Sequence, residues 1–278
     1  SPILISNLLE LAHSYYVKMQ AAFDQKSLMA ANNKSYSGEK SYHALAKQSA
    51  EYYLALVKAR GKNRMNGSSL YLAAEALFKA GEYQQSINVY ERAAYDQTGH
   101  ADAMNAGYAA ILTYSDLAKS YQPKMDAVTA DLHKKARRKS IERFAKYFPG
   151  AKQTPALLNG LASEFFQEKD YLNAANISSE AMSKTIAKPD ILYASGLINA
   201  HSNFELERYQ QAEIVYERLL AYKKEKDKNV LSERLAAAIY KQAEQETSTH
   251  LSAELYLKVV DKVPNASIVP QALYDSAS

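Results

Sequence analysis

The sequence has no cysteine, few residues that form tight turns and no apolar run long enough to cross a membrane. Of its 278 residues none is Cys, 9 are Gly and 7 are Pro. Without thiols the chain can form neither a disulfide nor a thiolate zinc site. No apolar stretch approaches the roughly 20 residues that a spanning helix needs. Ala, Leu, Lys, Glu and Gln, which are good helix formers, fill much of the chain, so the composition predicts a largely helical protein.

Neither end of the sequence carries a recognisable boundary signal. The chain begins at Ser1 with no charged flank followed by a cleavable apolar stretch. Its last residues predict a loop that enters a further short helix near Tyr274. We therefore expect the natural protein to continue beyond residue 278.

Three segments of the chain share one pattern, in which an apolar helix, a turn containing Tyr and a second apolar helix follow one another. The segments start at Leu70, Leu158 and Gly196, and they align without gaps through both helices. Tyr171 and Tyr209 in the turns are 38 residues apart, close to the period of about 34 found in one class of helical repeat. The turn triplets are Gly81-Glu82-Tyr83, Lys169-Asp170-Tyr171 and Glu207-Arg208-Tyr209.

Small and bulky residues recur in a fixed order within these copies. The small positions are Ala74, Ala162 and Ala200 on the first helices, and Ser86, Ala174 and Ala212 on the second. Tyr90 and Tyr216 occupy the bulky position of the second helix, where the middle copy has Ser178. This order resembles tetratricopeptide (TPR) repeats. The resemblance implies an all-α, right-handed superhelical solenoid of antiparallel helix pairs, with a concave groove along the first helices.

Helical patterns also fill the rest of the chain, and we expect about six pairs and no strands. We divide the chain into an N-terminal helical region at residues 1–66, which is a degenerate repeat, and a TPR-like array at 67–278 with an irregular extended repeat at 101–149. The further predicted helices are Ile3–Gln25, Ser41–Arg60, Ala101–Ser120, Val128–Phe148, Ser232–Glu246 and Leu251–Lys262.

An aromatic residue stands five positions before each turn tyrosine. Two roles fit this row: packing between repeats, or an aromatic ladder that binds an apolar or extended ligand in the groove. In the second role, residues one turn away on the same helices would share the exposed face. The row consists of Phe78, Phe166 and Phe204, with Tyr240 at a comparable place in the following pair. The neighbouring groove residues would be Tyr71, Glu75, Asn159, Ser163, Leu197 and His201.

These groove positions lack the Lys and Asn residues with which some TPR domains clamp a terminal carboxylate. We therefore do not expect an adaptor for chaperone tails. The partner that we expect is a protein or peptide that lies along the aromatic row.

Basic residues are concentrated in the second half of the irregular repeat. Between Tyr121 and Tyr147 the chain has 8 basic residues, Lys124 among them, against 3 acidic ones, while the whole chain carries +4. The densest part is a basic patch of Lys134, Lys135, Arg137, Arg138 and Lys139. This basic patch is either the solvated face of a long helix or a surface that attracts an acidic partner or anionic lipid. We expect no nucleic-acid partner, because nucleic-acid binders spread basic charge more widely.

Catalytic and metal-binding patterns are missing from the sequence. The 6 His residues are scattered, with no pair one helical turn apart beside a carboxylate. The segment Ser37–Ser41 resembles part of a phosphate loop but lacks the preceding Gly and strand. We therefore expect no enzyme activity, no metal and no cofactor.

Three functional hypotheses remain. The first is a non-catalytic scaffold that binds a peptide or protein in its groove. The endings FPGA and VPNA and the Tyr-rich helices resemble repeats of bacterial cell-envelope scaffold proteins, which implies a periplasmic or envelope location and a possible membrane-associated complex. The second is a subunit of a cytoplasmic complex. The third is the helical solenoid of a larger enzyme, such as a cell-wall-acting one, whose catalytic part lies outside this sequence.

Overall fold

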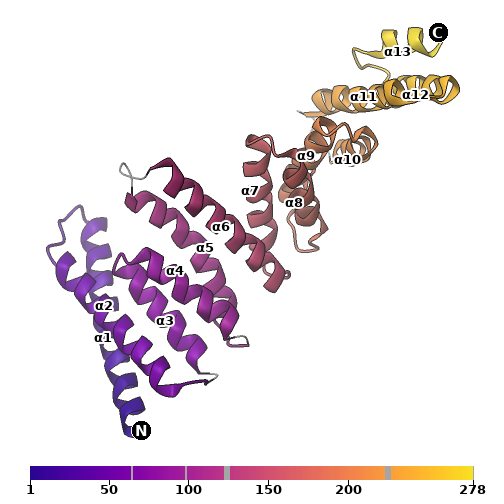
Figure 1. The fold of residues 1–278 in the computed structure, drawn as a ribbon. Helices are drawn as coiled ribbons and strands as arrows, with labels where there is room; N and C mark the ends of the chain where they lie inside the picture. Colours follow the sequence, from indigo (N-terminus) through magenta and orange to yellow (C-terminus); the bar gives the residue numbers. More distant parts are fainter. Residues whose placement is uncertain (64, 98, 122–125, 223–226, 278) are drawn as a thin grey trace. The chain divides into compact units, whose positions relative to one another are not determined.

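The computed structural model describes residues 1–63, 65–97, 99–121, 126–222 and 227–277 (Figure 1). Within these ranges every regular element is a helix, and no strand occurs. None of the described helices is both long enough and apolar enough to span a bilayer. The predicted all-α fold class is confirmed.

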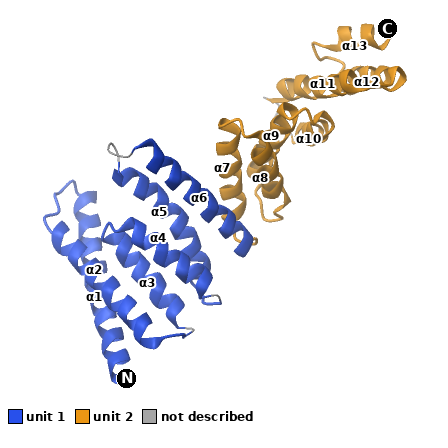
Figure 2. Ribbon diagram, in the orientation of Figure 1, with its two compact units in different colours: residues 1–148 blue, residues 149–278 orange. Residues whose placement is uncertain are grey.

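The chain divides into two compact units, Ser1–Phe148 and Pro149–Ser278 (Figure 2). The boundary predicted from the sequence, between residues 66 and 67, falls inside unit 1 and stays a prediction. The core of unit 1 includes Tyr53 of the N-terminal region together with Leu70 and Tyr90 of the first recognisable copy.

In unit 1 each helix packs on the next one in the chain, and α3 also contacts α5. A contact between helices two apart places the first helices of successive pairs side by side, as a stack of helix pairs requires. The elements are α1 (Pro2–Ala31), α2 (Glu39–Arg60), α3 (Asn66–Lys79), α4 (Tyr83–Glu91), the π-helical segment η1 (Arg92–Asp96), α5 (Ala103–Tyr121) and α6 (Ala127–Tyr147).

Unit 2 repeats this arrangement, with successive helices in contact and α7 also contacting α9. Its core includes Tyr216 and Leu235. The elements are α7 (Thr154–Gln167), α8 (Tyr171–Ser183), α9 (Pro189–Glu205), α10 (Tyr209–Ala221), α11 (Lys228–Gln245), α12 (Thr249–Lys262) and α13 (Val269–Ser276).

The predicted organisation into six pairs is confirmed for the described residues, with α1 to α12 as the pairs and α13 after them. The short helix expected near Tyr274 is α13. One difference lies in α1, which continues to Ala31 rather than ending at Gln25. The residues that extend it, KSLMAA, include good helix formers and contain neither Gly nor Pro. The π-helical segment η1 was not predicted, because nothing in the repeat pattern signals it.

The two helices of each pair meet at the small residues. In the first copy the Ser86 hydroxyl on α4 donates a hydrogen bond of 2.8 Å to the backbone carbonyl of Ala74 on α3. A side chain can reach the backbone of its neighbour only where the helices approach closely. In the other two copies Ala162, Ala174, Ala200 and Ala212 are all fully buried. The predicted register of the three copies agrees with this burial.

The middle copy compensates for its missing bulky residue with polar groups. Ser178, where the other copies have Tyr, is fully buried and donates a 2.6 Å hydrogen bond to the carbonyl of Ala174. The side-chain amide of Asn199 on α9 donates to the Ser178 hydroxyl at 3.2 Å and to the Ala175 carbonyl at 2.8 Å. A buried polar seam therefore joins this pair to the next.

The three turns close with the same geometry. Gly81, Lys169 and Glu207 have positive φ angles of 78°, 61° and 58°. The amide of each following residue donates to a carbonyl five residues before it, at 3.0, 2.9 and 2.8 Å: Glu82 to Leu77, Asp170 to Phe165 and Arg208 to Asn203. This is the Schellman helix ending, in which the left-handed residue is usually Gly.

Replacing Lys169 with Gly is expected to raise the free energy of unfolding by about 0.5–1 kcal/mol, because glycine has no Cβ to strain the left-handed conformation. Replacing Gly81 with Ala is expected to lower the free energy of unfolding by about 1 kcal/mol, because the added Cβ strains the left-handed conformation. Urea denaturation measures both changes. Lys169→Ala is the matched control, since it removes the same exposed side chain but keeps a Cβ. Equal stability of Lys169→Gly and Lys169→Ala would contradict the argument.

Replacing Ala162 with Leu is expected to lower the free energy of unfolding by about 1–3 kcal/mol, because the larger side chain overpacks the contact between α7 and α8. Thermal and urea unfolding measure the effect. Gly160→Leu is the control on the same helix, since Gly160 is exposed and a Cβ there meets nothing within 4 Å. If both variants unfold like the unmodified protein, the register of the repeat is wrong.

Candidate interaction site

A pocket of about 270 Å³ lies among α3, α4 and α5 of unit 1. Two of the predicted groove residues of α3, Glu75 and Phe78, line it. Tyr90 of α4 and the exposed Leu112 of α5 provide further apolar walls, and Asp116 adds a second carboxylate. Mostly apolar walls with a few polar groups are typical of a binding site.

Glu75 is surrounded by tyrosines. The Tyr16 hydroxyl of α1 donates a hydrogen bond of 2.7 Å to its Oε2 atom. Burial, and after it the Glu75 carboxylate, raises the pKa of Tyr16 well above the usual value and the pKa of Tyr71 to about 12. Both phenols therefore remain protonated at neutral pH, and Tyr16 serves as a donor that orients the carboxylate.

Lys79 lines the same pocket but is turned toward an aromatic ring. Its Nζ atom lies 3.3 Å from the centre of the Phe23 ring. Burial lowers the pKa of the Lys79 amine, while Glu75 and Asp24 act in the opposite direction. The ammonium group and the Glu75 carboxylate thus have separate partners on α1.

The phenylalanine row packs against the turns. Phe78, Phe166 and Phe204 are half-buried, and each ring meets the turn tyrosine of its own copy edge-on. The ring centres lie 5.4, 5.5 and 5.1 Å apart, with interplanar angles of 60°, 63° and 65°. Edge-on pairs at this distance stabilise a fold beyond the area that they bury. The packing role is thus visible in the structure, and the role in binding stays a prediction.

Tyr240 differs from the other members of the row. Its ring lies 5.0 Å from that of Tyr256 at 55°, and its hydroxyl donates to Asp275 of α13. It therefore links α11 to α12 and α13. Its part in a groove also stays a prediction.

The remaining predicted groove residues of unit 2 are half-buried on α7 and α9. Asn159 accepts a 2.9 Å hydrogen bond from Ser195, which joins the two helices. The His201 ring is 2.6 Å from the Tyr216 hydroxyl, and burial lowers the pKa of its imidazole. Ser163 and Leu197 complete the predicted set, and the part of these four residues in binding stays a prediction.

The basic patch lies on α6. Lys134, Lys135 and Lys139 are exposed, whereas Arg137 and Arg138 are half-buried. Lys135 forms an ion pair of 2.7 Å with Asp131 on the same helix. Lys124, which belongs to the same basic stretch, lies outside the described residues. The patch as a binding surface stays a prediction.

Sequence reasoning missed the partner of Glu75 and several residues that line the pocket. Tyr16 reaches Glu75 from 59 residues away, and no repeat pattern pairs those positions. Leu112 and Asp116 belong to the irregular repeat, where the alignment gives no register. Among the described residues no cluster of three or more His, Asp or Glu side chains could hold a metal ion.

No protein-family model matches this chain, and neither does any curated protein. Several solved structures are similar to this chain at low sequence identity, and two of them are described here. One is a tetratricopeptide repeat protein from Parabacteroides merdae ATCC 43184, 11% identical, with a TM-score of 0.37, over 95% of this chain and 100% of that one. The fold is tetratricopeptide-like. The helix pairs, the small-residue contacts and the shared turns described above are the features that define this fold.

The second likeness is to the APC/C hetero-tetramer Cut9–Hcn1. It is 16% identical, with a TM-score of 0.32, and covers 98% of this chain and 48% of that one. A tetratricopeptide-like fold is in general that of a scaffold for protein–protein interaction, since stacked repeats form extended binding surfaces.

The buried tyrosines predict a loss of stability at alkaline pH. Burial raises the pKa of Tyr42, Tyr71 and Tyr114 to about 12 in the folded chain, against about 10 in an unfolded one. The stability that they contribute is therefore complete below pH of about 10 and falls as the pH rises toward about 12. Urea midpoints across this range, with phenolate absorbance, measure it.

Tyr71→Phe is the comparison for this pH effect, because it removes one titrating group and should make the alkaline loss of stability less steep. Titration of every tyrosine near the ordinary pKa in the folded protein would contradict the prediction.

Proposed function

We propose that this chain is a non-catalytic scaffold that binds a protein or peptide partner through the pocket among α3, α4 and α5. The pocket itself supports the proposal, because it combines aromatic and aliphatic walls with two carboxylates on the first helices of neighbouring pairs. The half-exposed Leu112 is the residue that a partner would cover. Buried apolar anchors of this kind dominate the affinity of most interfaces.

The Glu75 carboxylate gives the pocket its polarity. Tyr16 already uses one of its oxygens, which fixes the orientation of the group without neutralising it. A partner side chain with hydrogen-bond donors can approach the carboxylate, while its apolar part packs on Phe78 and Leu112. The arrangement provides orientation as well as buried area, which is how ligand sites gain specificity.

Replacing Leu112 with Asp is expected to weaken partner binding at least tenfold, which is a loss of about 1.4 kcal/mol, because the charge must be desolvated beneath the partner. Affinity capture with the whole chain from a lysate of the source cells, followed by titration of the captured partner, measures the effect. Leu28→Asp is the matched control, since Leu28 is exposed on α1 and does not line the pocket.

A variant with Arg137, Arg138 and Lys139 changed to Glu separates groove binding from charge-driven binding. The proposal expects this variant to bind normally, and it expects binding of the unmodified protein to depend little on salt, because the contact is mainly apolar. Binding carried by the basic patch would instead weaken as salt rises, because exposed charges are screened within about 10 Å at 0.1 M salt. Loss of the partner in the basic-patch variant, with full binding by Leu112→Asp, would place the site on α6 and contradict the proposal.

We also propose a periplasmic or cell-envelope location. The sequence endings FPGA and VPNA suggested this location, and both follow helices with similar caps. Phe148 after α6 has φ −126° and ψ 58°, and Val263 after α12 has φ −140° and ψ 63°. A signal peptide or lipidation motif at the start of the complete gene product would support this location. Its absence would favour the cytoplasm and would leave the pocket proposal unchanged.

A further inference from the structure

The first half of α6 contributes no side chain to the core of unit 1. The buried residues of this helix begin at Ser140, and none of residues 127–139 is buried. Val128 is 71% exposed and Leu132 is 60% exposed. Single exposed apolar residues are ordinary, but two large ones that lie one helical turn apart indicate a surface that meets another apolar phase.

These two residues begin a stripe that runs along one face of α6. Lys135 and Lys139 follow Val128 and Leu132 at the spacing of a helical face, and all four side chains are exposed. We call Val128, Leu132, Lys135 and Lys139 the α6 stripe. With a rise of about 1.5 Å per residue, Lys135 lies about 4.5 Å behind Leu132 along the helix and Lys139 about 10 Å behind it. The apolar side chains therefore lead and the cations follow.

A third large side chain lies at the same end of the α5–α6 hairpin. Tyr121, at the end of α5, is 43% exposed, and its ring centre lies 5.5 Å from that of His133 on α6. An exposed tyrosine has an apolar ring with a polar tip, which suits the boundary between water and an apolar phase.

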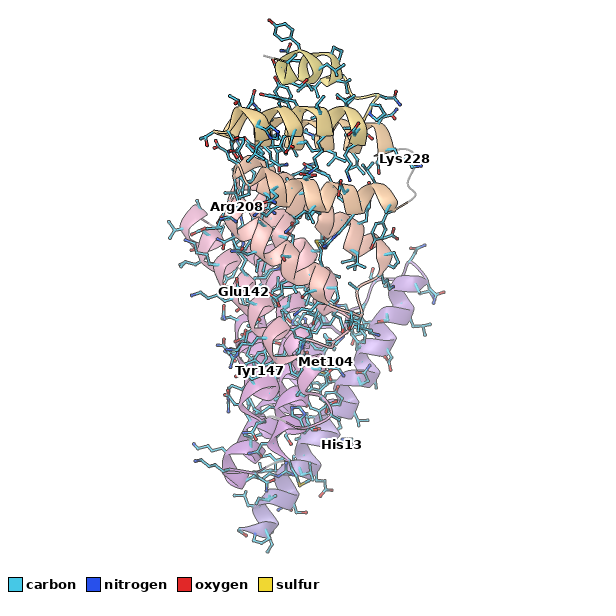
Figure 3. All side chains as sticks on the ribbon, turned by 90° about the vertical axis from the view of Figure 1, so that its right-hand side faces the viewer. His13, Met104, Glu142, Tyr147, Arg208 and Lys228 are labelled. Carbon is cyan, nitrogen blue, oxygen red and sulfur yellow. The ribbon has the colours of Figure 1, made fainter. Side chains whose placement is uncertain are left out.

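The charge of α6 is strongly positive, and the acidic groups near the stripe have partners of their own. Asp126 accepts a hydrogen bond of 2.9 Å from the Thr129 amide, and Asp131 pairs with Lys135 at 2.7 Å. An ammonium group has three hydrogens, so Lys135 retains donors for a second anion. Figure 3 labels Glu142, the other acidic residue of the helix. The basic residues of α6 are Lys134, Lys135, Arg137, Arg138, Lys139, Arg143 and Lys146.

The exposed cations of the stripe are lysines, whereas an arginine of the same helix packs on unit 1. Arg143 lies with its Cζ atom 4.0 Å from the centre of the Tyr95 ring, and its Nη1 atom is 3.5 Å from Glu91. Arginine is the residue that grips one carboxylate with a rigid fork, while lysine is a flexible point charge on an apolar stem. Flexible lysines suit a layer of mobile anions.

We propose that the α6 stripe binds the surface of a bilayer that contains anionic lipids. Val128 and Leu132 enter the boundary between head groups and acyl chains, and the ammonium groups of Lys135 and Lys139 meet the lipid phosphates above them. The order of apolar and cationic groups along the stripe matches the order of depth in a bilayer. An acidic protein surface would satisfy the lysines but would leave Val128 and Leu132 against charged groups.

The test is co-sedimentation of the full chain with vesicles of phosphatidylcholine that contain about one third phosphatidylglycerol, an anionic lipid. We expect binding to these vesicles, about tenfold weaker binding to pure phosphatidylcholine, and weaker binding as salt rises, because salt screens the lysines. Absence of binding to the anionic vesicles at low salt, or equal binding to both kinds of vesicle, would overturn the proposal.

A lysine variant tests the cationic part of the stripe. Changing Lys135 and Lys139 together to Gln should weaken vesicle binding about twentyfold, since each lysine near an anionic surface strengthens binding about fivefold. The matched control changes Lys58 and Lys62 to Gln, which removes the same charge from exposed positions elsewhere in unit 1. An equal loss in this control would show attraction by net charge alone and contradict a site on α6.

An alanine variant tests the apolar part and separates a lipid surface from an acidic protein. Changing Val128 and Leu132 together to Ala should weaken vesicle binding about tenfold, because methyl groups that enter the bilayer are lost while helix propensity is kept. The matched control changes Leu28 and Val230 to Ala, which are 66% and 63% exposed on other helices. Full binding by the Val128 and Leu132 variant would leave charge as the only attraction, which an acidic protein meets equally, and would refute the lipid assignment.

The pocket in unit 1 is tested separately from this surface. Leu112→Asp, which is expected to weaken binding of the protein partner, should leave vesicle binding unchanged, since Leu112 lies on α5 in the pocket and outside the stripe. Loss of vesicle binding in Leu112→Asp, with helix content retained by circular dichroism, would place the lipid contact at the pocket and overturn the assignment to α6.

Discussion

Each recognisable helix pair closes on a contact between small side chains, and a larger residue there would push the helices apart. The hydroxyl of Ser86 on the Ala74 carbonyl shows how near the two backbones come. The two helices of a pair therefore pack closely and antiparallel, and the turn with its left-handed residue joins them. The edge-on Phe–Tyr pairs then fix the turn. The position of the pocket in unit 1 follows from this spacing, since it lies between neighbouring pairs.

The two units differ in how they hold their polar side chains. In unit 1 the Glu75 carboxylate is oriented by the Tyr16 hydroxyl, which burial keeps protonated. In unit 2 neutral amides orient one another through a chain of hydrogen bonds that begins at a backbone carbonyl. The first arrangement places a carboxylate at the wall of the pocket in unit 1. The second fixes each amide by the direction of its donors and acceptors.

The sequence predicted the fold well because the fold depends on local spacing. The small positions, the turn tyrosines and the Phe row all lie within one copy, so alignment of the copies was enough to find them. The pocket in unit 1 was only half predicted, because Glu75 and Phe78 follow the repeat whereas Leu112 and Asp116 belong to the irregular one. Tyr16, which orients Glu75 from outside the pocket, lies 59 residues before it in the sequence and was not predicted either. The hydrogen bond from Asn203 to Asn199 was not predicted, because it depends on the partners of Asn199.

The buried contact of Asn199 with Ser178 makes the repeats of unit 2 non-interchangeable. A copy carrying tyrosine at the Ser178 position has a ring in place of the short Ser178 hydroxyl, so exchanging neighbours would remove this side-chain partner of the buried Asn199 amide. The order of these two copies along the chain therefore depends on complementary side chains at their junction. Recombination that shuffles whole copies, a common route of change in repeat proteins, would be penalised at this junction.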